Sequence, residues 1–196
     1  GMASSVFNGK ILSVKCSLEN KNNGEDIHDP VLDNGYDGIT YAAKTGYYAG
    51  VRTIINCSWG AAGGGASGQA VINSAYNNYG AIVVAAAGNG KDTDGNGEGD
   101  ETAYEAHYPS SYDNVVSVAA VKCNYSTVAW PFTYHNTVDL SAPGDQVYST
   151  IIGGGYQSWP GSSMASPNAA SVMGLVWTYH PTWTNEDIIQ QVKLVA

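Results

Sequence analysis

Apolar residues along the chain follow two different periods. Short apolar runs typical of buried β-strands occupy residues 10–16, 53–58, 81–87 and 115–121. The run at 81–87 is unbroken, as expected for a strand that is buried on both faces of a parallel sheet. Apolar positions three or four residues apart predict helices between and after these strands. This alternation predicts an α/β fold, with a doubly wound, mostly parallel sheet and flanking helices.

The predicted helices carry signals at their ends. Asp33 is the predicted N-cap of a helix whose apolar positions run from 36 to 47. Thr184 and Asp187 match the capping signature of the last helix. Pro167 is expected in the first turn of a buried helix, where its missing N–H costs little. We find no repeat or linker, so residues 2–196 are predicted to form one domain, and Gly1 is interpreted as an expression scar.

Charge and composition exclude several classes of function. Lys and Arg number 8 against 17 Asp and Glu, which gives a net charge of −9. An acidic surface repels phosphate backbones and anionic lipids, so neither nucleic acid nor a membrane is an expected partner. The longest apolar run, at 81–87, is too short to span a bilayer. The three cysteines are not a disulfide framework and are interpreted as small buried hydrophobes.

Unusual residues follow the predicted strands, where ligands bind in sheets of this type. Residues 58–60 follow the second strand, and Gly88 and Asn89 follow the third. Ser163 comes after a glycine turn, at the start of a buried helix, beside the positive end of the helix dipole. Backbone N–H groups there can face a developing oxyanion, so the position suits a nucleophile. The alternative is that Ser162 or Ser163 only caps the helix.

Residues 161–167, Gly-Ser-Ser-Met-Ala-Ser-Pro, resemble the nucleophile motif of the subtilases, the subtilisin-like serine proteases. Ser162 stands where the family pattern has Thr, and Asn168 where it has His. Further segments resemble the family in the same order, and the resemblance extends from residue 10 to residue 195. These further matching segments are residues 54–60, 84–89, 108–121 and 140–144.

The resemblance implies a role for each matched residue. Ser163 would be the nucleophile, and Asn89 would donate a hydrogen bond to the oxyanion. Gly88 would line the pocket for the residue before the scissile bond. His107 is interpreted as a surface histidine, with narrowing of that pocket as the alternative. The backbone of Ser58, Trp59 and Gly60 would pair with an extended peptide or protein substrate.

The family's catalytic Asp and His motifs are not found in this sequence. Asp33 follows a strand that corresponds to one after the family's His, and none of the four histidines is interpreted as the base. The chain is therefore predicted to be the C-terminal portion of a subtilase catalytic domain. Its parent would be an extracellular serine endopeptidase that acts through an acyl-enzyme, and this portion alone would be inactive.

Two other functions stay open from the sequence. One is a peptide-binding pseudoprotease, and the other is a calcium-stabilised structural fragment. We also expect self-association, either through residues 10–16 as a strand edge left exposed by truncation or through an apolar patch uncovered beside the nucleophile helix.

An acidic loop matches the first nine positions of an EF-hand calcium loop. Gly97 stands at the sixth position, but Ala103 stands at the twelfth, where a Glu is expected. The segment is therefore interpreted as a solvated acidic loop, with a structural calcium site as the alternative, and no cofactor is required. The oxygen ligands would come from Asp92, Asp94, Asn96 and Asp100.

Overall fold

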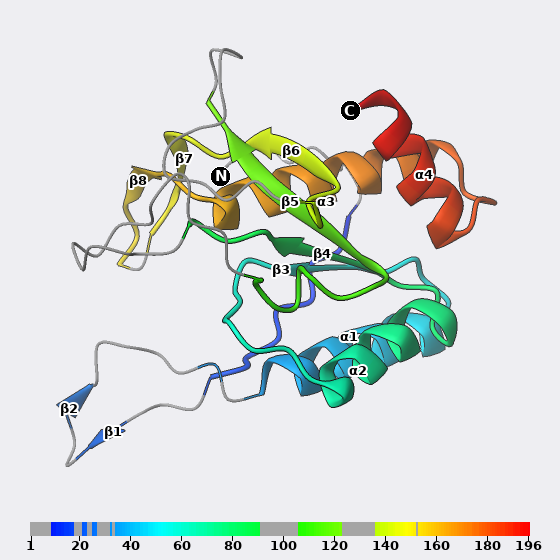
Figure 1. Ribbon diagram of the computed structural model, residues 1–196, viewed down its shortest axis with the longest axis horizontal. Helices are drawn as coiled ribbons and strands as arrows, with labels where there is room; N and C mark the ends of the chain where they lie inside the picture. The colour runs from blue at the N-terminus through cyan, green and yellow to red at the C-terminus, as the bar shows by residue number, and fades with distance from the viewer. Residues whose placement is uncertain are drawn as a thin grey trace.

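The computed structural model describes residues 9–17, 21–22, 25–26, 32, 34–90, 106–122, 136–151 and 153–196. Its helices and strands follow one another as shown in Figure 1. In chain order they are β1 (Lys21–Asn22), β2 (Glu25–Asp26), α1 (Gly35–Tyr48), β3 (Ile54–Cys57), α2 (Ala66–Asn77), β4 (Ile82–Ala86), β5 (Val115–Val121), β6 (Leu140–Pro143), β7 (Val147–Thr150), β8 (Tyr156–Trp159), α3 (Ser162–Tyr179) and α4 (Asn185–Val195).

A parallel sheet of four strands, in the order β3-β4-β5-β6, forms the centre of the molecule. Every residue of β4 is buried, which confirms the prediction of a strand covered on both faces. Because all four strands run the same way, their carboxyl ends lie along one edge of the sheet. Two antiparallel pairs, β1 with β2 and β7 with β8, stand apart from it.

Helices cover both faces of the sheet, as predicted. In Figure 1, α1 and α2 lie together on one side of the strands, and α3 and α4 lie on the other. Two apolar cores result. Ile39, Ile72 and Val83 belong to the core under α1 and α2, and Val84, Val118 and Met173 belong to the core under α3 and α4. Within the described residues, no helix combines the length and hydropathy needed to cross a membrane.

Two predictions about helix ends need correction. The N-cap residue of α1 is Asn34, whereas the predicted Asp33 lies outside the described residues. Pro167 is not in the first turn of α3, because the helix already begins at Ser162. Proline has no N–H, so the carbonyl of Ser163, four residues earlier, has no helical donor at this position.

Residues 10–16 do not form the predicted strand. They pair with no described strand, and the side chain of Ile11 is 97% exposed. An apolar run becomes a strand only when a neighbouring backbone supplies hydrogen bonds. In the described sheet β3 is the edge strand, so residues 10–16 do not extend the sheet beyond it. The self-association expected through this segment stays a prediction.

The capping box of α4 is present as predicted. The side chain of Thr184 accepts a hydrogen bond from the backbone of Asp187, whose carboxylate accepts one from the backbone of Thr184. We expect Thr184→Ala to lower the free energy of unfolding by about 1 kcal/mol, measured by urea denaturation. Thr184→Ser keeps the hydroxyl and should stay close to the parent. Equal loss in both variants would contradict the capping role.

Candidate active site

Three chain segments meet where the sheet strands end. Ser58 directly follows β3, Gly88 and Asn89 follow β4, and Ser163 is the second residue of α3. The hydroxyl of Ser58 donates to the carbonyl of Ser163 at 2.7 Å, and the backbone N–H of Gly88 donates to the hydroxyl of Ser162 at 3.2 Å. The structure therefore brings together residues that the sequence singled out at distant positions.

The environment of Ser163 suits a nucleophile. It is half-buried in the first turn of α3, and Gly161 precedes the helix with φ of 143°, a conformation that favours glycine. The positive end of the helix dipole acts at this position, and the first turn contains no acidic residue that would cancel it. The backbone N–H of Ser163 has no hydrogen-bond partner within the described part of the chain. It is available to an incoming oxyanion.

Hydrogen bonds from Ser162 set the orientation of the Asn89 amide. Its Oδ1 accepts from both the backbone N–H and the hydroxyl of Ser162, each at 2.9 Å. A flipped amide would place NH₂ against a backbone N–H, which can only donate. Nδ2 is therefore left with its two donors, on a residue that is exposed to solvent. Asn89 Nδ2 and the Ser163 N–H are two neutral donors that can stabilise a negatively charged oxygen.

The end of β3 presents its backbone rather than its side chains. Trp59 packs against the glycine backbone at Gly35 and makes an edge contact with Tyr36. A Cβ at Gly60 would lie 2.5 Å from Nδ1 of His107, so that ring occupies the side-chain space of Gly60. The predicted backbone role of Ser58, Trp59 and Gly60 stays a prediction.

His107 lies between the ends of β3 and β4. Besides its contact with Gly60, its Nδ1 lies 3.3 Å from the carbonyl oxygen of Ala86, the last residue of β4. Ala86 lies two residues before Gly88, which the resemblance assigns to a pocket that His107 could narrow. The pocket function itself stays a prediction.

Cys57, next to Ser58, is not a rival nucleophile. Its side chain is 1% exposed. Burial, and secondarily the nearby Cys16 thiol, raises the pKa of Cys57 to about 12. Because the thiolate is the reactive form, a thiol with this pKa is inert at neutral pH. The interpretation of Cys57 as a small buried residue is confirmed.

The two described histidines have other contacts. His180 follows the last residue of α3, at the opposite end of the helix from Ser163, and stacks on Trp183. His107 is held against Gly60 and Ala86. His28 and His135 lie outside the described residues.

The predicted calcium ligands Asp92, Asp94, Asn96 and Asp100 also lie outside the described residues. Within the part that is described, no group of three His, Cys, Asp or Glu side chains is placed to hold a metal ion. The calcium loop therefore stays a prediction.

Sequence reasoning missed the buried polar residues that support the site. Ser162 and Ser166 are both 0% exposed, and the hydroxyl of Ser166 donates to Oδ1 of Asn56 on β3 at 2.8 Å. The available signal was the spacing of two serines four residues apart on the inner face of an apolar helix. Buried hydroxyls at such a spacing need partners on a neighbouring element.

The structure thus places Ser58, Asn89 and Ser163 where the parallel strands end and α3 begins. Comparison with protein families matches residues 5–195 to the subtilase family. The chain belongs to the subtilase family.

Curated relatives and solved structures support the family assignment. The chain is 38% identical over 169 residues to a thermostable alkaline protease of Halalkalibacterium halodurans, covering 85% of this chain and 43% of the relative. It is 38% identical over 140 residues to thermitase of Thermoactinomyces vulgaris, covering 71% of this chain and 44% of the relative. The S41 psychrophilic protease superposes with a TM-score of 0.66 at 27% identity, covering 82% of this chain and 55% of that one. The chain thus spans less than half of these curated relatives.

The bonds around Ser162 lead to a stability prediction. Ser162→Ala would leave the buried N–H of Gly88 without its acceptor. It would also remove the hydroxyl that donates to Oδ1 of Asn89. We expect a loss of about 1–3 kcal/mol in the free energy of unfolding, measured by urea denaturation. Ser163→Ala, one residue away, removes a hydroxyl that makes no hydrogen bond to the described residues and should change stability by about 0.5 kcal/mol or less. Similar losses in the two variants would refute this account.

Proposed function

We propose that this chain supplies the nucleophile and the oxyanion donors of a serine endopeptidase. The observation that carries the proposal is the pair of Ser162–Asn89 hydrogen bonds, which leaves Asn89 Nδ2 free to donate and joins Asn89 to the residue next to Ser163. Membership of the subtilase family and the protease names of the relatives support it.

The proposed reaction divides peptide hydrolysis into two steps. Ser163 Oγ attacks the carbonyl carbon of the scissile bond, its proton passes to a base, and the carbonyl oxygen becomes an oxyanion. The two donors stabilise that oxyanion. When the oxyanion collapses, the C–N bond breaks and the amine leaves with a proton from the base. Water then cleaves the Ser163 ester by the same route in reverse.

The substrate would bind as an extended strand. The backbone at Ser58–Gly60 continues β3 beyond its last paired residue and is suited to hydrogen bonding with a peptide main chain. The pocket for the residue before the scissile bond would lie beside Gly88, with His107 next to it. Proteins or peptides are therefore the proposed substrates.

The base is proposed to come from residues outside this chain. A serine without an activating base is a weak nucleophile, so this chain alone should not hydrolyse peptides. An extracellular setting belongs to the same proposal, because it rests on the family alone.

A binding function without catalysis is the second candidate. The observation that favours it is the placement of His107 and His180, which hold other contacts. In this case an extended peptide would bind at Ser58–Gly60 and remain intact. Detection of cleavage products that disappear in Ser163→Ala would exclude it.

Reaction with a fluorophosphonate tests the proposal directly. We expect the folded chain alone to show no adduct by intact-mass spectrometry at neutral pH, because no base activates Ser163. Ser163→Ala is the control for reaction at other serines. An adduct on the parent chain that is absent from Ser163→Ala would mean that a base within this chain reaches Ser163, and the proposed inactivity would be wrong.

A further inference from the structure

We propose that the side chain of Ser58 is a positioning group for Ser163, because it replaces a helix hydrogen bond that Pro167 cannot make. The naming of Ser163 as nucleophile rests on the proposed function, whereas the hydrogen bond itself does not. Ser58 was predicted to act through its backbone, so a role for its hydroxyl is additional to that prediction.

The need for such a group follows from the helix geometry. In an α-helix each carbonyl accepts from the N–H four residues later. The carbonyl of Ser163 would therefore accept from residue 167, which is proline and has no N–H. A half-buried carbonyl without a donor is costly, and this one belongs to the candidate nucleophile itself.

Ser58 fills this position from another element. Its hydroxyl donates to the carbonyl oxygen of Ser163 at 2.7 Å, across 105 residues of sequence. The contact joins the end of β3 to the first turn of α3. It holds the nucleophile's backbone relative to the sheet that also carries Asn89.

Asn56 and Ser166 orient the Ser58 proton. Ser166 donates to Oδ1 of Asn56 at 2.8 Å, and Nδ2 of Asn56 donates to the Ser58 hydroxyl at 2.9 Å. The hydroxyls of Ser58 and Ser166 also lie 3.2 Å apart. The Ser58 oxygen accepts from Asn56, and because the Ser163 carbonyl can only accept, the one proton of Ser58 is donated to that carbonyl. Such chains of hydrogen bonds strengthen one another in a partly buried environment.

This arrangement gives Ser58 two separate connections. Its backbone lies where an extended peptide is proposed to pair, and its side chain holds the backbone of Ser163. The peptide-binding strand and the nucleophile would then keep a constant relative position through one residue. Pro167 makes this connection necessary, since a residue with an N–H at that position would supply the donor within α3.

The sequence allows this carbonyl to be observed alone. Met164 is the only methionine that follows a serine, because Met2 follows Gly1 and Met173 follows Val172. A chain labelled with carbonyl-¹³C serine and ¹⁵N methionine therefore gives a single signal in an HNCO spectrum, from the Ser163–Met164 peptide. A carbonyl that loses a hydrogen bond shifts upfield.

We expect Ser58→Ala to shift the Ser163 carbonyl signal upfield by more than its line width. Ser58→Thr keeps the hydroxyl and should leave the signal near its original position. Asn56→Ala leaves Ser58 in place but removes the group that orients its proton, so a smaller upfield shift is expected. This third variant keeps the test valid if Ser58→Ala does not fold.

Pro167→Ala provides the decisive comparison. This substitution restores a backbone N–H that can donate to the Ser163 carbonyl within α3. Adding Ser58→Ala in the Pro167→Ala background should therefore produce less than half the shift seen with Pro167 present. An unchanged signal in Ser58→Ala, or an equal shift in both backgrounds, would overturn the proposal. The spectrum tests the hydrogen bond whether or not Ser163 is a nucleophile, and fluorophosphonate reaction tests the nucleophile separately.

Discussion

Two hydrogen bonds from Ser162 to Oδ1 of Asn89 determine what the candidate site can do. One of them comes from a backbone N–H, which can only donate, so the amide has one acceptable orientation. Nδ2 then remains available to a ligand, together with the N–H of Ser163. The hydroxyl of Ser162 is in turn held by the N–H of Gly88 at the end of β4. The chemistry of the site thus depends on a serine that would not itself react.

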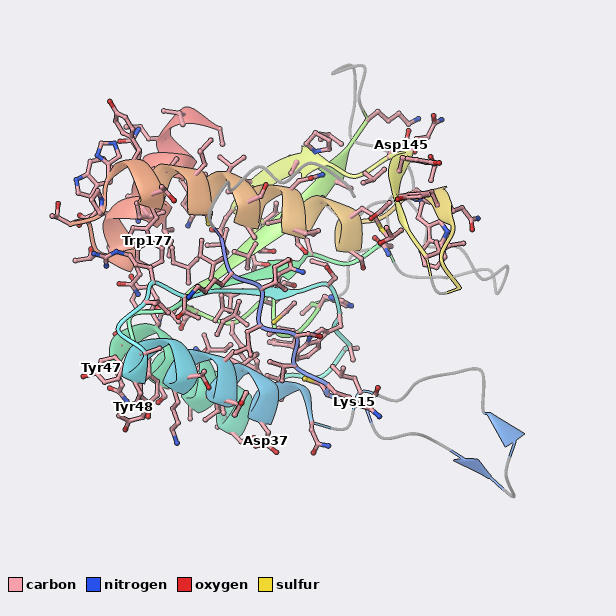
Figure 2. The ribbon with its side chains drawn as sticks, turned by 180° about the vertical axis from the view of Figure 1, so that it is seen from behind. Lys15, Asp37, Tyr47, Tyr48, Asp145 and Trp177 are labelled. Atoms are coloured by element: carbon pink, nitrogen blue, oxygen red, sulfur yellow. The ribbon has the colours of Figure 1, made fainter. Side chains whose placement is uncertain are left out.

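The parallel sheet makes these contacts possible. Buried strands of small and β-branched residues place the ends of β3 and β4 side by side. The helix α3 crosses one face of the sheet (Figure 1), and its Ala165, Ala169 and Met173 belong to the apolar core on that face. Figure 2 shows α3 from behind, with Trp177 labelled near the C-terminal end of the helix. Near Trp177, Arg52 makes a cation–π contact and a hydrogen bond. The Arg52 guanidinium lies 5.2 Å from the centre of the Trp177 ring and also donates to the carbonyl of Pro181. The far end of α3 is thereby attached to the loop before β3, so the helix is fixed at both ends.

Much of this fold was predictable because its strongest signals are local. The apolar run of β4, the strand β5 and the capping box of α4 all depend on neighbouring residues and match the structure. The prediction for residues 10–16 was wrong because strand formation depends on a partner that sequence patterns do not reveal. Ser163 and Asn89 could be named from motifs, but the Asn56–Ser58–Ser166 network could not. Its members are far apart in sequence, and each alone is an ordinary polar residue.

Chemical rescue by free imidazole tests most directly whether this chain carries a preassembled site that lacks only a base. The rate of fluorophosphonate adduct formation on Ser163 would be measured against imidazole concentration at a pH above the pKa of imidazole. The account predicts that the rate rises with imidazole, that Ser163→Ala abolishes the adduct, and that Asn89→Asp lowers the rate while keeping the acceptor for Ser162. A folded chain that forms no Ser163 adduct at any imidazole concentration, or an adduct whose rate does not change in Asn89→Asp, would contradict it.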